Sequence, residues 1–461
     1  MEHIVFLTGR LAQPSLTRVL ESMAPAPFEW EVREIGLQVA GLMTADLIER
    51  RVSAPVRADR ILVPGRCRGD LDALSRHYGV PVARGPEELK DLPAFFDRAA
   101  KPVDLSRHDI AIFAEVVDAP QLDVDALVAR ARQLRADGAD VIDLGCLPAT
   151  AFPHLEDAVR ALKGEDFRVS VDSQDGEELR RGGRAGADYL LSLKPDTLWL
   201  TDEVDATPVL IGDSPADEIS LFKAIESMAA RGRPFLADSI LDPLPFGLTA
   251  SIVRYYRLRE RFPDVRIMMG TGNLTELTDA DTSGVNAVLL GIAAELRASA
   301  ILTTQVAEHA RRVVREVDAA RRLMYAARKE QTLPKGLSDA LLTVHDRRPF
   351  PDTAAEIAAT ARAIKDPNFR VQVCAGGIHV YNRDGHHIAA DAFALFPHLK
   401  VESDGAHAFY LGVELARAEI ALQLGKRYVQ DQPLDWGVAA DRADDDLTSW
   451  HAAGTTLAHK R

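Results

Sequence analysis

Apolar and polar positions form one repeating pattern between residues 110 and 304. A short apolar run is followed each time by a stretch in which apolar residues recur with helical period. Short apolar runs bounded by turn residues are typical of buried strands, and strands alternating with helices are typical of a parallel sheet. Eight such units in succession predict an α/β fold, a closed (β/α)8 TIM barrel. The runs are IAIFAE, ADVIDLG, FRVSVDS, ADYLLSLK, TPVLIGD, RPFLAD, VRIMMGTGN and SAILTT.

Polar side chains lie at the ends of these predicted strands. Glu115 ends the first run, and Asp143 and Asp172 lie near the ends of the second and third. The carboxyl ends of all barrel strands meet at one face, so these side chains predict a single binding site in the barrel mouth. One aspartate at a strand end caps the following helix about as often as it serves a site, but three together favour a site. Further candidates are Ser192, Lys194, Asp238, Asp242 and Asn273.

The segments on either side of the barrel predict two further domains. Residues 1–105 read as a small Rossmann-like α/β unit, and a polar linker that contains Pro102 separates it from a barrel over 106–330. Residues 331–461 predict an α+β domain. It contains a hairpin that turns at residues 382–385, followed by the helical segment GAHAFYLGVELARAEIALQLG.

Charge and composition exclude several classes of protein. The formal net charge is −14 over 461 residues, whereas nucleic-acid binders concentrate Lys and Arg, so we expect no nucleic-acid partner. The apolar run in MEHIVFLTGR is too short for a signal sequence or a membrane span, so we expect a cytoplasmic protein without a membrane partner. The three cysteines are widely spaced and show no zinc-ligand pattern.

Three barrel segments resemble the pterin-binding barrels, the family that includes dihydropteroate synthase. RARQLRADGADVIDLG is similar to the family's second strand and the helix before it, VSVDS to its SVDT strand, and LADSILDP to its LDPGFG segment. The resemblance implies that Asp143 and Asp172 are the catalytic carboxylates. It also implies that either Asp238 or Asp242 binds the aminopyrimidine edge of a pterin. Barrels of this family often pair through their outer helices, so a homodimer is the starting expectation.

A longer resemblance covers nearly the whole chain. MMGTGNLTEL, ADSILDPLPFG and HAFYLGVELARAEIAL are similar to a branch of dihydropteroate synthase-related proteins associated with tetrahydromethanopterin. That resemblance implies a transferase that condenses a 6-hydroxymethyl-dihydropterin diphosphate with an arylamine. The implied arylamine is a ribofuranosylaminobenzene phosphate.

The chain also departs from the synthase pattern. Glu115 replaces the asparagine that binds magnesium in synthases, so the resemblance implies an altered Mg²⁺ site with Glu115 as a ligand. LSLK replaces an Asn-Asp pair, and the cations expected after the last two strands are absent. Ser192 and Lys194 are therefore the expected substrate contacts on the fourth strand, where Lys194 substitutes for a missing cation.

Two other functions fit the same barrel. The GTGN and DPLPFG segments resemble those of pterin-dependent methyltransferases, in which Asn273 would hydrogen-bond the pterin near N5. No DxHxxG corrinoid motif accompanies them. The third function is a non-catalytic pterin-binding protein, which the loss of the synthase cations favours.

Overall fold

A computed structural model describes residues 1–26, 28–86, 89–97 and 103–441. The chain forms two compact units. Among the described residues, one unit contains residues 103–343 and 436–441, and the other contains the flanking segments up to residue 97 and over residues 344–435. Pro102, part of the predicted linker, lies outside the described residues, as does the end of the predicted third domain from residue 442.

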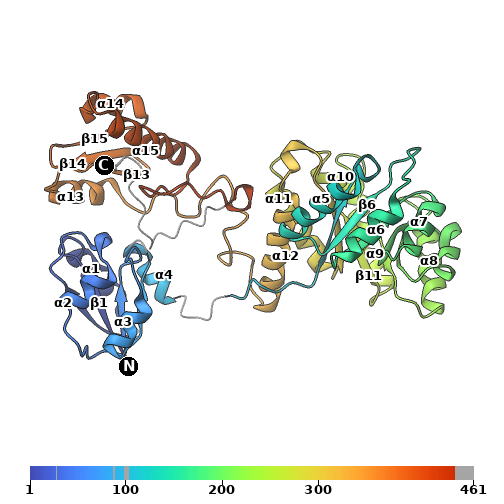
Figure 1. The fold of residues 1–461 in the computed structure, drawn as a ribbon, viewed down its shortest axis with the longest axis horizontal. Coiled ribbons are helices and arrows are strands. Elements are labelled where there is room, and N and C mark those ends of the chain that lie inside the picture. The colour runs from blue at the N-terminus through green and yellow to red at the C-terminus, as the bar shows by residue number, and fades with distance from the viewer. Residues whose placement is uncertain (27, 87–88, 98–102, 442–461) are drawn as a thin grey trace. The chain divides into compact units, whose positions relative to one another are not determined.

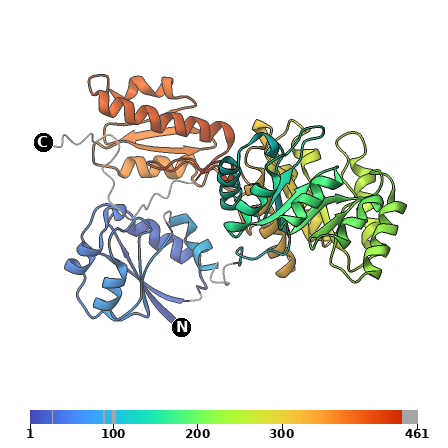
Figure 2. The same cartoon turned by 45° about the vertical axis from the view of Figure 1, so that its right-hand side comes forward.

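The first unit is the predicted barrel, in which eight strands pair in parallel around a closed ring. Figures 1 and 2 show this unit, coloured from teal to gold, with helices around its strands. All eight predicted runs form strands of this ring. In ring order they are β10 (Leu236–Ala237), β11 (Arg266–Gly270), β12 (Ala300–Thr304), β5 (Ala111–Val116), β6 (Val141–Gly145), β7 (Arg168–Asp172), β8 (Tyr189–Leu193) and β9 (Thr207–Leu210).

Helices follow the strands and cover the outside of the barrel, with one exception to the predicted pattern. The connection after β8 is a 3₁₀ helix, Pro195–Asp202, which begins with a proline. The α-helices are α5 (Val124–Ala136), α6 (Leu155–Gly164), α7 (Gly176–Arg184), α8 (Glu218–Ala230), α9 (Leu248–Arg261), α10 (Gly272–Thr275), α11 (Thr282–Glu295) and α12 (Val313–Lys329).

Alternation along the strands decides which side chains enter the barrel. Phe113 and Val141 belong to the cluster that fills the interior. Because successive strand residues point to opposite faces, Glu115 and Asp143, each two residues further on, point to the same interior. Val171 faces the outer helices, which leaves its neighbour Asp172 on the inside. The apolar filling therefore ends in a layer of carboxylates.

The N-terminal segment forms a four-stranded parallel sheet in the order β2-β1-β3-β4, which agrees with the expected Rossmann-like α/β pattern. Its strands are β1 (Glu2–Thr8), β2 (Phe28–Glu34), β3 (Arg60–Val63) and β4 (Val82–Arg84). Its helices are α1 (Gln13–Ser22), α2 (Ala45–Arg51), α3 (Leu71–Tyr78) and α4 (Leu92–Asp97).

The C-terminal segment forms a three-stranded antiparallel sheet with three helices. Its strands are β13 (Arg370–Cys374), β14 (Gly377–Asn382) and β15 (Gly385–Ala389), so the turn predicted at 382–385 joins the last two. The helices are α13 (Ala354–Ala363), α14 (Ala392–Leu399) and α15 (Gly405–Leu424). The predicted helical segment near the C-terminus is α15.

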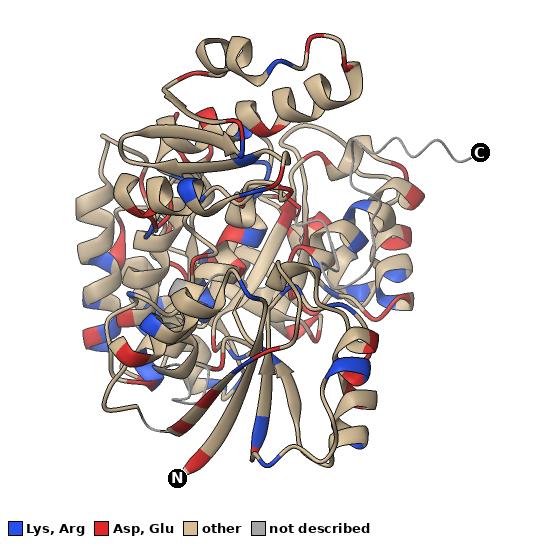
Figure 3. Cartoon of the chain, turned by 90° about the vertical axis from the view of Figure 1, so that its left-hand side faces the viewer, with Lys and Arg blue, Asp and Glu red and all other residues tan. Residues whose placement is uncertain are grey.

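Charged residues of both signs are interspersed along the helices of both units (Figure 3). Among the described helices, none is both long and apolar enough to cross a membrane.

Candidate active site

A cavity of about 650 Å³ opens at the carboxyl ends of the barrel strands. This volume lies within the range of about 300–1,000 Å³ that is usual for small-molecule sites. Six of the eight predicted site residues line it: Glu115, Asp172, Ser192, Lys194, Asp238 and Asn273. A seventh, Asp143, lies beneath Glu115 and Asp172 and is fully buried.

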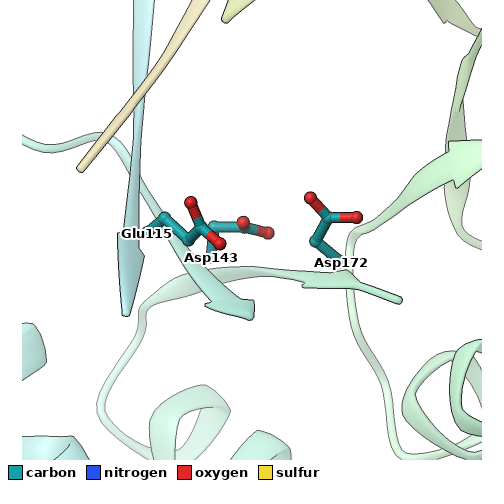
Figure 4. A group of neighbouring side chains, drawn as sticks. All are labelled: Glu115, Asp143 and Asp172. Atoms are coloured by element: carbon teal, nitrogen blue, oxygen red, sulfur yellow. The ribbon is translucent and has the colours of Figure 1, made fainter. Parts of the chain in front are cut away.

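Three carboxylates from adjacent strands meet at the floor of the cavity. Glu115 on β5 and Asp143 on β6 are direct cross-strand neighbours, and Asp172 ends β7 one layer higher. One oxygen from each of the three lies within 4.8 Å of the others. Figure 4 shows the carboxyl groups of Glu115 and Asp143 close together, with Asp172 across from them.

Gly145 makes room for this arrangement. It follows Asp143 on β6, and a Cβ atom at this position would lie 2.6 Å from Oε1 of Glu115. Any side chain here would therefore displace the Glu115 carboxylate. The glycine allows the longer glutamate to reach over β6 toward Asp172.

The three carboxylates are held at close range without a compensating cation from the described residues. Asp143 accepts a short hydrogen bond from the Ser170 hydroxyl through Oδ1, while its buried Oδ2 has no hydrogen-bond partner in the described part of the chain. Burial, and then the charges of Asp172 and Glu115, hold the pKa of Asp143 well above its usual range.

The same physical causes act on the other two members of the cluster. Burial, followed by the charges of Asp172 and Glu276, raises the pKa of Glu115 to about 7. Burial and the charge of Asp238 raise the pKa of Asp172 to about 6. Near neutral pH the cluster therefore retains protons unless a cation neutralises it.

Asp238 is held in one orientation on the other side of the cavity. Its Oδ1 accepts a short hydrogen bond from the Tyr255 hydroxyl and another, of 2.6 Å, from the amide of Ile240. Oδ2 points toward Gly270, which also lines the cavity, and no hydrogen bond to Oδ2 is found among the described residues. Burial raises the pKa of Asp238 to about 6, although the Tyr255 and Ile240 hydrogen bonds oppose the rise.

Asp242 lies apart from the cavity lining. Its Oδ2 forms a 2.9 Å ion pair with the guanidinium of Arg254, which is itself buried. This pairing engages the carboxylate and ties the loop after β10 to α9. Of the two candidates that the sequence left open for ring contact, Asp238 is therefore the one with a free oxygen at the cavity.

The remaining predicted residues line the wall between β8 and β11. Asn273, at the start of α10, donates a 2.7 Å hydrogen bond from Nδ2 to the carbonyl of Leu241, which leaves its amide oxygen for a ligand. Ser192 and Lys194 lie on β8 and directly after it. Among the described residues that line the cavity, Lys194 is the single Lys or Arg.

Sequence reasoning missed three residues that shape this site. Tyr255 lies inside α9, where the helical pattern marks it only as a core position. Gly145 reads as a strand-end glycine without a distinct signal. Glu276 lines the cavity, and its carboxylate accepts hydrogen bonds of 3.0 and 2.7 Å from the amides of Val306 and Ala307. In the sequence, the signal for Glu276 was its position three residues after Asn273.

Comparison with known proteins gives two family matches, each to a part of the chain. Residues 2–87 match a family of unknown function (DUF6513), and residues 393–431 match a family described as PterinBD-DUF4346. The second match covers most of α14 and α15, outside the barrel. The curated "Uncharacterized protein MJ0107" of Methanocaldococcus jannaschii is 25% identical over 93% of this chain and 98% of its own length.

Similar solved structures are dihydropteroate synthases. The Yersinia pestis enzyme with a pterine-sulfa conjugate is 19% identical, with a TM-score of 0.36, over 49% of this chain and 95% of its own. The Xanthomonas albilineans enzyme in complex with 7,8-dihydropteroate is 20% identical, with a TM-score of 0.36, over 50% of this chain and 95% of its own. The Anaplasma phagocytophilum enzyme with 6-hydroxymethylpterin-monophosphate is 14% identical, with a TM-score of 0.37, over 47% of this chain and 98% of its own.

Proposed function

We propose that the barrel mouth binds a reduced pterin diphosphate and joins the pterin through its methylene carbon to an arylamine, as a dihydropteroate synthase does. The observation that carries this proposal is the fixed carboxylate of Asp238, with one oxygen anchored and the other available at the cavity. A 2-amino-4-oxopterin presents N–H donors along one edge. A buried, oriented carboxylate binds such an edge through charge-assisted hydrogen bonds.

The floor of the cavity suits the charge that develops during transfer. The C–O bond between the pterin methylene and diphosphate breaks, a C–N bond to the arylamine forms, and the amine nitrogen loses a proton. Positive charge grows on the methylene carbon as the diphosphate leaves. Asp172 and Asp143 are proposed to stabilise that charge, because preorganised carboxylates act strongly in a site that excludes water.

The proposed second substrate is an arylamine that bears a phosphate, such as a ribofuranosylaminobenzene phosphate. Lys194 supports this choice, since it can pair with a phosphate group or with the departing diphosphate. The sequence resemblance to the tetrahydromethanopterin-associated branch supports it as well. Mg²⁺ near Glu115 would add a positive charge next to the leaving group.

The test is calorimetry and product analysis with dihydropterin diphosphate and separate arylamines. We expect Asp238→Asn to weaken pterin binding by about tenfold or more, because it removes a charge-assisted hydrogen bond worth about 1.5–3 kcal/mol. Asp172→Asn and Asp238→Asn should each slow condensation by at least about a hundredfold. Unchanged turnover in both variants would remove these residues from the mechanism.

Asn273 supports methyl transfer from a reduced pterin as a second candidate. It lines the cavity and keeps its amide oxygen unengaged by the hydrogen bond to Leu241. The two reactions differ in what leaves the pterin. Release of diphosphate identifies the synthase, and loss of a methyl group from a methylated pterin identifies the methyltransferase. Binding of a pterin with neither outcome would identify a non-catalytic binding protein.

A further inference from the structure

We infer that Glu115, Asp143 and Asp172 bind one divalent metal ion by themselves, before any pterin or diphosphate enters the cavity. Their oxygens lie within 4.8 Å of one another. Oxygen ligands at about 2.0–2.6 Å from a Mg²⁺, Mn²⁺ or Ca²⁺ ion lie on a sphere about 4–5 Å across. The spacing of the three oxygens therefore fits a single hard cation.

The strongest indication is the buried oxygen of Asp143. Oδ2 is inaccessible to solvent and has no hydrogen-bond partner among the described residues, while Oδ1 is occupied by Ser170. A buried carboxylate oxygen without a partner is costly, so a ligand is expected to satisfy it. A cation suits this oxygen, because the nearest groups are two more carboxylates.

Lysine and arginine side chains do not supply that charge. No ion pair in the described part of the chain includes any of the three carboxylates, whereas the neighbouring Asp242 and Asp140 each have an arginine partner. The cluster is therefore set apart from the structural ion pairs of the barrel. One divalent cation would leave a net charge of −1 on three ionised carboxylates.

The positions of the ligands indicate a built site rather than a random group of acids. Glu115 and Asp143 are paired in register across β5 and β6, and Gly145 leaves the space in which the Glu115 carboxylate lies. Ser170, the cross-strand neighbour of Asp143, orients it by a hydrogen bond from behind. Such supporting bonds to ligands are typical of metal sites. The open side of the cluster faces the cavity, so waters or substrate oxygens can complete the coordination.

This inference is tested with Mn²⁺ alone, on the full chain after treatment with EDTA and in the absence of pterin. Electron paramagnetic resonance measures free Mn²⁺ during titration, and isothermal calorimetry gives the stoichiometry. We expect one Mn²⁺ per chain. Glu115→Gln and Asp143→Asn should each weaken binding by about tenfold or more, in the range found when metal sites lose supporting groups.

Asp213→Asn is the matched control. Asp213 lines the same cavity from the end of β9, four strands around the ring from β5, and should leave Mn²⁺ affinity unchanged. Circular dichroism and thermal unfolding check that each variant is folded, and Glu115→Gln preserves the size of the side chain if Asp143→Asn does not fold. The inference is wrong if the wild-type chain binds no Mn²⁺ at about 1 mM, the weak end of protein sites. It is also wrong if folded Glu115→Gln binds as tightly as Asp213→Asn.

Metal binding and pterin binding can fail separately. Asp238→Asn should weaken pterin binding and leave Mn²⁺ binding in place. A chain that binds Mn²⁺ but no pterin would retain the cation site and lose the proposed function.

Discussion

Tyr255 favours the ionised form of Asp238, the carboxylate that is proposed to bind the pterin. Its hydroxyl donates to Oδ1 of Asp238 and thereby opposes the rise in the Asp238 pKa that burial causes. With a pKa of about 6, Asp238 is ionised above that pH and accepts hydrogen bonds from the pterin edge. We therefore expect pterin affinity to fall as the pH decreases through about 6.

Tyr255→Phe should move this pH dependence upward. The variant loses the donor that favours the ionised form, so the pKa of Asp238 rises and the affinity falls at a higher pH than in the wild type. Calorimetric titrations with a pterin between pH 5 and 8 measure the midpoint. Tyr256→Phe on the exposed side of the same helix is the control. Identical midpoints in wild type and Tyr255→Phe would contradict this role.

Gly145 should be as important to the cation site as a ligand. In Gly145→Ala the new Cβ would overlap the Glu115 carboxylate, so we expect a loss of Mn²⁺ affinity of about tenfold or more. Gly164→Ala is the control, because a Cβ there meets nothing within 4 Å. Mn²⁺ titration of the two folded variants measures the difference. Equal affinities would show that Glu115 can relocate without cost.

At the scale of elements, the closing helix of the barrel is joined to the strands by one buried arginine. Arg321 on α12 donates to the carbonyl of Ile110 at 2.7 Å and to that of Gly138 at 3.0 Å, and it forms ion pairs with Asp140 and Asp318. Ile110, Gly138 and Asp140 lie just before the amino ends of β5 and β6, and Asp318 lies on α12 itself. This end of a barrel generally serves stability, whereas the opposite end serves function.

Arg321→Met should therefore destabilise the protein while leaving the affinity of the folded site unchanged. Removing one partner of a buried ion pair leaves uncompensated charge and costs about 3–5 kcal/mol. Urea unfolding measures the loss, with Arg160→Ala, from an exposed pair with Asp157, as a control expected within about 0.5 kcal/mol of wild type. A large loss of Mn²⁺ affinity in folded Arg321→Met would contradict the assignment of stability to one end of the barrel and binding to the other.

The sequence predicted strands and helices well where periodicity is strong and less well where it is interrupted. All eight barrel strands were predicted, because each lies in a short, mostly apolar run that is followed by a polar or turn residue. The helix expected after β8 is a 3₁₀ helix over Pro195–Asp202, where apolar residues do not recur with the α-helical period. The run ending in Asp238 gives a strand of only Leu236–Ala237, because the backbone turns to bond the Asp238 carboxylate at Ile240.

Some residues of the candidate site could be predicted from the sequence and others could not. Carboxylates at the ends of apolar runs can be recognised in the sequence. Strand alternation then places Glu115, Asp143 and Asp172 inside the barrel. The contribution of Tyr255 depends on how α9 packs against β10, which no local pattern encodes. That Asp242 is paired, whereas Asp238 has an oxygen at the cavity, likewise depends on the position of Arg254.

At the scale of the whole molecule, the buried acids make stability depend on pH. The folded pKa values of Glu115 and Asp172, about 7 and about 6, lie above their ordinary values of 4.5 and 3.8. Groups with raised folded pKa values bind more protons in the folded state, so their stabilising contribution is complete below about pH 4. It is lost as the pH rises through about 6 to 7.

Metal-free protein should therefore lose unfolding free energy from these groups between pH 5 and pH 8. Urea unfolding after EDTA treatment measures the loss across this range. Glu115→Gln should show a shallower loss, and saturating Mn²⁺ should stabilise the wild type more at pH 8 than at pH 5. A profile that is the same in wild type and Glu115→Gln would contradict this assignment of the pH dependence.

The pairing of β12 with β5 gives the barrel a seam between its first and last strands. Thr304 lies beside Glu115 across this seam, although the two residues lie near opposite ends of the barrel sequence. A growing chain on the ribosome has made all three carboxylates long before the strand that encloses Glu115 exists. The side of Glu115 that faces β12 is therefore covered only after the last strand of the barrel has been made.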